Sequence, residues 1–165
     1  MIEPWMSGSY AEVNPLLRPL LHAFDHALLD LEHWTTGLTT EQLWASPHNL
    51  GPIGFHLRHI TGSTDRLFTY AEGQALTEAQ LQTLKSEMNP GATREELLHE
   101  MRQTFDAIAQ KVRNIDPATL SEPRYIGRKR LPTTLHSLLV HIAEHTMRHV
   151  GQAIVTIRVV KAAPC

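Results

Sequence analysis

Apolar residues recur at spacings of three and four along four long stretches of the chain, which is the pattern of helices that bury one face. Leu17, Leu20, Leu21 and Phe24 in the first stretch show the spacing. The four stretches cover about residues 15–34, 52–70, 93–114 and 133–160. The sequence therefore predicts four long amphipathic helices.

The connections between these stretches carry their own signals. A threonine followed three residues later by glutamine or glutamate marks a helix start, and this capping box occurs at residues 39–42 and 93–96. Pro52 suits a first helical position. Residues 77–88 look like a short surface helix. The segment SEPRYIGRKRLPTT (121–134) has no helical period, so we expect a loop in which IGRKR forms a small turn or hairpin over one end of the helices.

Four amphipathic helices without a convincing long strand predict an all-α fold. We expect a four-helix bundle with a short extra helix and an irregular loop before the last helix. The connections differ greatly in length, so an up-down-up-down order is not required. At 165 residues and 18.6 kDa the chain is long enough for one well-packed core, and we expect a single domain over residues 1–165.

Composition limits the chemistry. A formal net charge of -2 gives no electrostatic footprint for nucleic acid. The one cysteine, Cys165, is the last residue, so the chain offers neither an internal disulfide nor a cysteine-rich metal site, and any metal must be held by nitrogen and oxygen. No signal-like N-terminus or run of about 18 apolar residues is present, so we expect no membrane partner and a cytoplasmic location.

Three histidines, His141, His145 and His149, follow one another at intervals of four in the last helix. On a helical wheel centred on Ile142, His149 lies about 20° away, His145 about 60° away and His141 about 100° away. Two imidazoles therefore point into the apolar stripe, and the third lies at its edge.

The second helix carries two more histidines in the block GFHLRHITGS. Measured from Ile60, His56 lies about 40° away and His59 about 100° away, so periodicity favours His56 as the inward residue. A site between two helices can also be lined from the edge of a stripe, which keeps His59 open.

Helix one provides a control, because HAFDH has the same H-x-x-x-H spacing. Measured from Phe24, His22, His26 and His33 all lie about 160° to 180° away, so we expect them to face water.

Burying an imidazole without a partner costs on the order of 1–3 kcal/mol. A divalent metal offers compensation: two histidines at i and i+4 can hold one ion, and a third from another helix makes an open, three-ligand site. The alternative is a set of core histidines satisfied by carbonyls, carboxylates and water. Asp65 and Glu144 could orient an imidazole, although carboxylates on an exposed face are the simpler interpretation.

The blocks GPIGFHLRHITGSTDRL (51–67) and LLVHIAEHTMRHVGQAIVTIR (138–158) strongly resemble the DinB-like superfamily of four-helix-bundle metalloproteins. The resemblance implies one divalent metal, nickel or zinc, bound by one histidine of the second helix and an H-x-x-x-H pair of the fourth. Matched residue by residue, these ligands are His59, His145 and His149. His56 remains the rival of His59, and His141 and His56 are otherwise candidates to support a ligand.

The resemblance also implies function. Similar proteins include thiol-dependent S-transferases and a mycothiol-dependent isomerase, so we expect a metal-dependent enzyme that transfers a low-molecular-weight thiol to a small electrophilic substrate. The alternative is a non-catalytic, metal-stabilised binding or stress-response module. No catalytic side chain is assigned. We expect a homodimer, and a metal affinity that falls below about pH 6.5, where free imidazole protonates.

Overall fold

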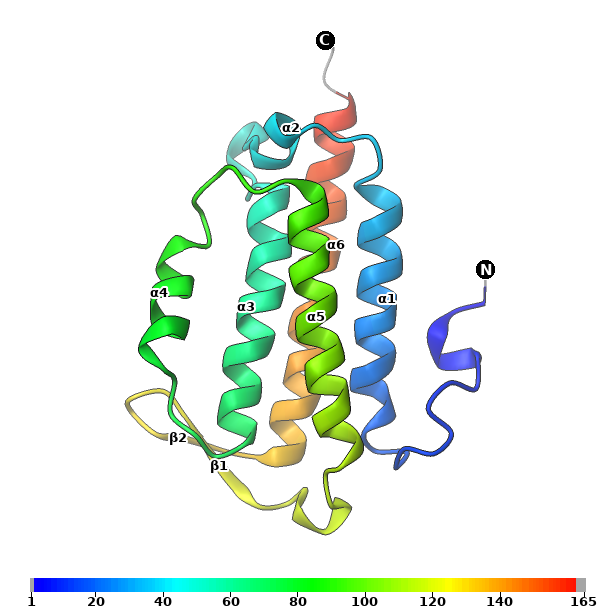
Figure 1. The fold of residues 1–165 in the computed structure, drawn as a ribbon, viewed down its shortest axis with the longest axis vertical. Coiled ribbons are helices and arrows are strands. Elements are labelled where there is room, and N and C mark those ends of the chain that lie inside the picture. Colours follow the sequence, from blue (N-terminus) through cyan, green and yellow to red (C-terminus); the bar gives the residue numbers. More distant parts are fainter. Residues whose placement is uncertain (1, 163–165) are drawn as a thin grey trace.

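Four long helices lie side by side in the computed structural model, which describes residues 2–162 (Figure 1). They are α1 (Arg18–Trp34), α3 (Ile53–Ala71), α5 (Arg94–Arg113) and α6 (Leu135–Ala162). Each coincides with one of the four stretches of helical periodicity. The predicted all-α class is confirmed.

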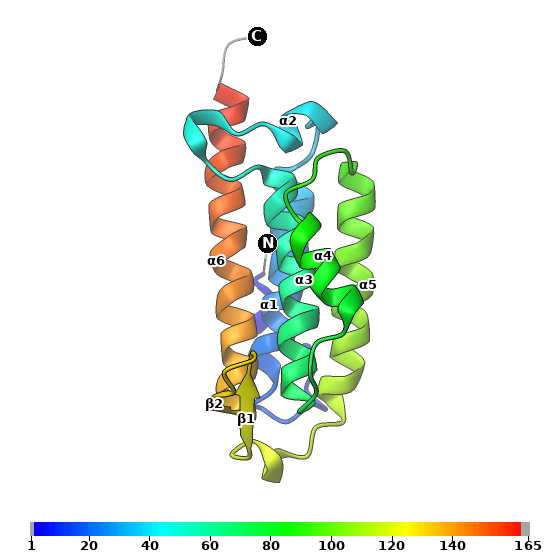
Figure 2. The ribbon, with the colours of Figure 1, turned by 90° about the vertical axis from the view of Figure 1, so that its left-hand side faces the viewer.

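The helices do not alternate in direction along the chain. α1 and α6 run one way, and α3 and α5 run the other way (Figures 1 and 2). Lys161 Nζ donates to the carbonyl oxygen of Trp34 at 2.9 Å, so α6 ends beside the end of α1. Arg94 Nη2 donates to the carbonyl oxygen of Glu32 at 2.9 Å, so α5 begins where α1 ends. α3 and α6 are thus antiparallel neighbours.

The short elements lie in the connections. The predicted capping boxes at Thr39 and Thr93 are present, and a third, between Thr77 and Gln80, opens α4. Pro52 is the cap that precedes α3, with ψ 146°, and not its first helical residue as predicted, because its backbone is still extended there. The short helices are α2 (Thr40–Trp44), α4 (Glu78–Ser86), η1 (Pro4–Met6), η2 (Pro47–Asn49) and η3 (Pro117–Thr119).

A small antiparallel hairpin precedes α6, as the segment around IGRKR suggested. Strand β1 (Pro123–Ile126) pairs with β2 (Leu131–Thr134). The hydroxyl of Thr134 then accepts the N–H of Ser137 at 3.2 Å, so Thr134 caps α6. The hairpin lies beside the end of α3 and the start of α6 (Figure 2).

One apolar core joins all four helices. Phe24 of α1 stacks on Phe105 of α5 with ring centroids 4.1 Å apart, and Leu57 of α3 and Ile157 of α6 are fully buried. Within residues 2–162 no helix has both the length and the apolar character needed to cross a membrane. Cys165 lies outside the described residues.

Candidate metal centre

Three histidines meet between α3 and α6. His59 of α3 and His145 and His149 of α6 each offer a ring nitrogen, and these nitrogens all lie within 4.8 Å of one another. The Nε2 atoms of His59 and His145 are 3.0 Å apart. Among residues 2–162 this is the one group of three or more histidine, cysteine or acidic side chains with metal-like spacing.

The spacing fits a transition-metal ion. Two nitrogens that bind one ion at about 2.1 Å lie roughly 3 to 3.4 Å apart in octahedral or tetrahedral geometry and never more than about 4.2 Å apart. The pair formed by His59 and His145 already has such a separation. Imidazole donors suit zinc and nickel.

His59 is held by a carboxylate that sequence analysis did not identify. Oε2 of Glu87 lies 2.7 Å from Nδ1 of His59, and Glu87 is only 3% exposed. A carboxylate at this position accepts the Nδ1–H, which leaves Nε2 unprotonated and aimed at the cluster. Glu87 directly follows α4 and is 28 residues from His59, and no periodicity or motif connects the two.

A buried arginine holds Glu87 in turn. Nη2 of Arg66 lies 2.7 Å from Oε1 of Glu87. Burial would raise the pKa of the Glu87 carboxyl, but the hydrogen bonds from His59 and Arg66 and the charge of Arg66 outweigh it, so this pKa lies below its ordinary value. Gly62 makes room for the pair, because a Cβ there would lie 2.7 Å from Glu87 Oε1 and 2.8 Å from Arg66 Nη1.

His149 is held by a buried histidine, His56. Nδ1 of His56 lies 3.0 Å from Nδ1 of His149, and His56 is 5% exposed. That contact occupies Nδ1 of His149 and leaves its Nε2 available to the cluster. His56, the inward residue by periodicity, therefore lies behind the cluster, whereas His59, from the stripe edge, belongs to it.

The cluster imidazoles of α6 are neutral at physiological pH. Burial, followed by repulsion from His59, lowers the pKa of His145 and of His149 to about 4. Burial also lowers the pKa of His56 to about 4. Neutral imidazole is the form that binds metal, so these rings carry no second proton that would compete with an ion.

The remaining histidines stay outside the cluster. His141 is half-exposed beside His145, and its Nδ1 lies 3.6 Å from Glu144. His33 is exposed as predicted, but His22 and His26 are half-buried. The expectation for His22 was too simple, because the N-terminal segment covers it: the Tyr10 ring lies 5.5 Å away.

The two carboxylates noted in the sequence do not orient a cluster imidazole. Asp65 is exposed and accepts a hydrogen bond from Gln80 at 2.7 Å. Glu144 pairs with Arg148 on the outer face of α6.

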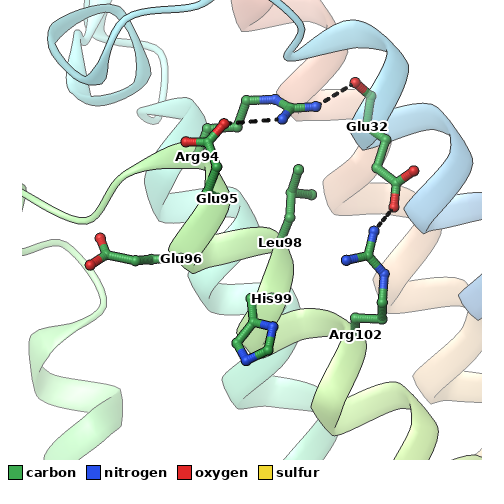
Figure 3. A pocket seen from close by; sticks show the side chains of 7 residues that line it. All are labelled: Glu32, Arg94, Glu95, Glu96, Leu98, His99 and Arg102. Atoms are coloured by element: carbon green, nitrogen blue, oxygen red, sulfur yellow. Dashed lines mark hydrogen bonds and ion pairs between the residues drawn. The ribbon is translucent and has the colours of Figure 1, made fainter.

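Two hollows help to locate a substrate. A groove of about 460 Å³ runs along His56, and its wall combines polar side chains such as Asn49, Arg148 and Gln152 with the apolar Leu50 and Val155. A larger hollow of about 600 Å³ lies between α1 and α5 (Figure 3). Its two arginines, Arg94 and Arg102, already form ion pairs and a hydrogen bond with Glu32 and Glu95. These cations are therefore not free to bind a substrate. The groove beside His56 is the one that adjoins the histidine cluster.

Fold and site together define a helical protein with a cluster of three histidines, spaced to hold a metal ion, between two antiparallel helices. A family model described as the DinB superfamily matches residues 23–153, which contain all three histidines and most of the four helices. The chain therefore belongs to the DinB superfamily. No curated protein matches it.

Proposed function

We propose that the protein is a divalent-metal-dependent enzyme that transfers a small thiol to an electrophilic substrate. The observation that supports this proposal is the cluster of His59, His145 and His149, whose nitrogens lie within 4.8 Å of one another. Three protein ligands leave coordination positions for a thiol or water, as in catalytic rather than structural sites. A divalent ion bound there would lower the pKa of a coordinated thiol and so provide a thiolate at neutral pH.

Neighbouring residues of the chain orient the histidine ligands and fix which ring nitrogen carries the proton. Glu87 keeps the proton of His59 on Nδ1, at 2.7 Å, so that Nε2 stays a donor to the ion. His56 performs the corresponding role for His149 at 3.0 Å. Because the first ligands are neutral imidazoles, they leave the charge of the ion largely uncompensated, which favours binding of an anionic thiolate.

The groove beside His56 offers a place for the reactants. Asn49 and Gln152 provide amide groups, and Arg148 provides a cation at its rim. These polar groups could bind the polar parts of a low-molecular-weight thiol, and Leu50 and Val155 provide apolar surface beside them.

The test is thiol consumption by full-length protein loaded with zinc or nickel. Each common cellular thiol is mixed with an aryl halide or a bimane electrophile, and product is followed by absorbance or fluorescence. The proposal predicts turnover that His149→Ala abolishes and His22→Ala preserves. If metal raises the melting temperature but no thiol is consumed, the non-catalytic binding module replaces this proposal.

A further inference from the structure

The segment that carries Glu87 is attached to the bundle almost entirely by polar contacts. α4 contains no buried residue. Leu84 and Met88 are 43% and 56% exposed, and Glu87 is the one buried residue between positions 78 and 90. Burial of apolar surface therefore contributes little to docking this segment.

Three sets of hydrogen bonds and ion pairs hold the segment on α3. The first joins Gln80 to the side chains of Asp65 and Thr69, the second joins Glu87 to His59 and Arg66, and the third joins the Arg58 guanidinium to the carbonyl oxygens of Ser86 and Asn89. Of these, the Glu87 set alone reaches a residue of the histidine cluster.

We propose that Glu87 is a positioning residue of the metal centre, and that through Glu87 the docking of α4 is coupled to metal occupancy. This inference rests on the proposed metal site. By fixing the tautomer and the ring plane of His59, Glu87 raises metal affinity only while the segment is docked. Thermodynamic linkage then requires a bound metal to strengthen docking by the same factor. α4 thus responds to the state of the centre.

Two glycines of the bundle give a matched pair of variants. Gly62→Ala would place a methyl group 2.7 Å from Glu87 Oε1 and 2.8 Å from Arg66 Nη1, so the ion pair must shift. Gly151→Ala, on α6, would meet nothing within 4 Å. Both changes replace a helical glycine with alanine, so they have the same intrinsic effect on helix propensity.

The experiment measures zinc affinity by chelator competition and amide hydrogen exchange of residues 78–87 with and without zinc, in the full chain. We expect Glu87→Gln and Gly62→Ala to weaken zinc binding about 10- to 100-fold and Gly151→Ala to leave it unchanged. Zinc should slow exchange in α4 of the wild type and do so much less in Glu87→Gln. Melting of the metal-free variants checks folding.

The outcomes distinguish failure of the proposed metal site from failure of its coupling to α4. If the wild type binds no zinc, nickel or other divalent ion, the proposed function fails. If the wild type binds zinc but Glu87→Gln and Gly62→Ala bind it within twofold of the wild type, or zinc leaves α4 exchange unchanged, the coupling alone is wrong. Should Glu87→Gln fail to fold, Gly62→Ala and the wild-type exchange data decide the question.

A second inference concerns a pocket at the C-terminal end of α3, away from His59 and Glu87. A pocket of about 560 Å³ lies between the end of α3, the following loop and the β1–β2 hairpin. Tyr70, Leu76, Leu81 and Tyr125 provide apolar surface there, and the cations that line it are Arg124, Arg128 and Arg130. Among the described residues, none that lines the pocket is acidic.

Two of these arginines, Arg128 and Arg130, carry charges that no acidic residue neutralises within residues 2–162. Arg124 is fixed by Ala71 and Glu122, but Arg128 and Arg130 have no ion-pair partner within residues 2–162. The Arg130 guanidinium lies 4.4 Å from the centroid of the Tyr125 ring. Guanidinium groups without an ion-pair partner that line a partly apolar pocket are suited to phosphate or carboxylate groups on a small organic molecule. We infer that this pocket binds a small organic anion with an apolar body.

Phenyl phosphate is the probe, with binding followed by calorimetry and by NMR of the full chain. Lys129 has the same charge and lies on the same hairpin but does not line the pocket, so Lys129→Gln is the matched control. We expect binding that Arg128→Gln and Arg130→Gln each weaken at least fivefold, that Lys129→Gln preserves, and that exceeds binding of inorganic phosphate. Equal losses in all three variants would show general surface attraction, and absence of binding at millimolar concentration would also overturn the inference.

Discussion

Acidifying the metal-free protein should destabilise it through His56 and the two α6 imidazoles of the histidine cluster, His145 and His149. In an unfolded chain histidine titrates near pH 6.5. In the folded protein burial, followed by repulsion from neighbouring imidazoles, lowers the pKa of His56, His145 and His149 to about 4. The unfolded state therefore binds more protons over this range, so stability is retained above about pH 6.5 and is lost as the pH falls toward 4.

The size of the effect follows from the shifts. A difference of about 2.5 pKa units corresponds to about 3 kcal/mol for one fully shielded group. His145 and His149 are only partly shielded from water, so their contributions are discounted by about half. Between pH 7 and pH 5, where the shift is only partly expressed, the three groups together should remove about 3 kcal/mol. That loss is a large part of the roughly 5–15 kcal/mol that stabilises a typical domain.

The assay is urea denaturation of chelator-treated protein at several pH values between 7 and 5. His145→Gln removes one titrating group and should reduce the pH dependence by about 1 kcal/mol. His33→Gln, at an exposed position, should leave the pH profile unchanged. Equal stability at pH 5 and pH 7, or an unchanged profile in His145→Gln, would refute the reasoning.

Further predictions concern metal, core and assembly. Metal affinity should fall with acid; burial lowers the pKa of His145 and His149 to about 4, so these two rings should stay available to the ion until the pH approaches that value, and calorimetric zinc titrations across pH measure this. His149→Ala should abolish zinc binding, whereas His22→Ala should retain the affinity of the wild type in the same titration. Phe24→Ala should lower the free energy of unfolding by about 3–5 kcal/mol in urea, because Phe24 is buried against Phe105. The homodimer stays a prediction, and a monomeric mass by light scattering at micromolar concentration would contradict it.

Hydrophobic periodicity was sufficient to place the helices, because each long helix buries one continuous stripe. It was less reliable for the single side chains of α3. The angle from Ile60 favoured His56 over His59, yet the cluster contains His59 and keeps His56 behind it. The reason is that the centre lies in the seam between α3 and α6, where side chains from the edge of each stripe meet. Resemblance to the family identified His59, since a sequence block fixes register better than an angle does.

Neither the contacts of Glu87 nor the direction of the helices could be predicted from hydrophobic periodicity. Glu87 follows an exposed helix, and its contacts with His59 and Arg66 depend on how the connection from α3 to α5 folds back along the bundle. Such a tertiary contact leaves no local periodic signal. Gly62 offered one indirect sign, because a glycine inside a helix costs stability and suggests a neighbour that needs the space.

X-ray absorption spectroscopy of the zinc- or nickel-loaded full chain, combined with metal content, tests the central claim most directly. The account predicts one ion per chain with three imidazole nitrogens in its first coordination shell, and a loss of one imidazole or of the ion in His59→Gln. His56→Gln should keep all three. A substoichiometric ion, or a spectrum unchanged by His59→Gln, would contradict a centre built from His59, His145 and His149.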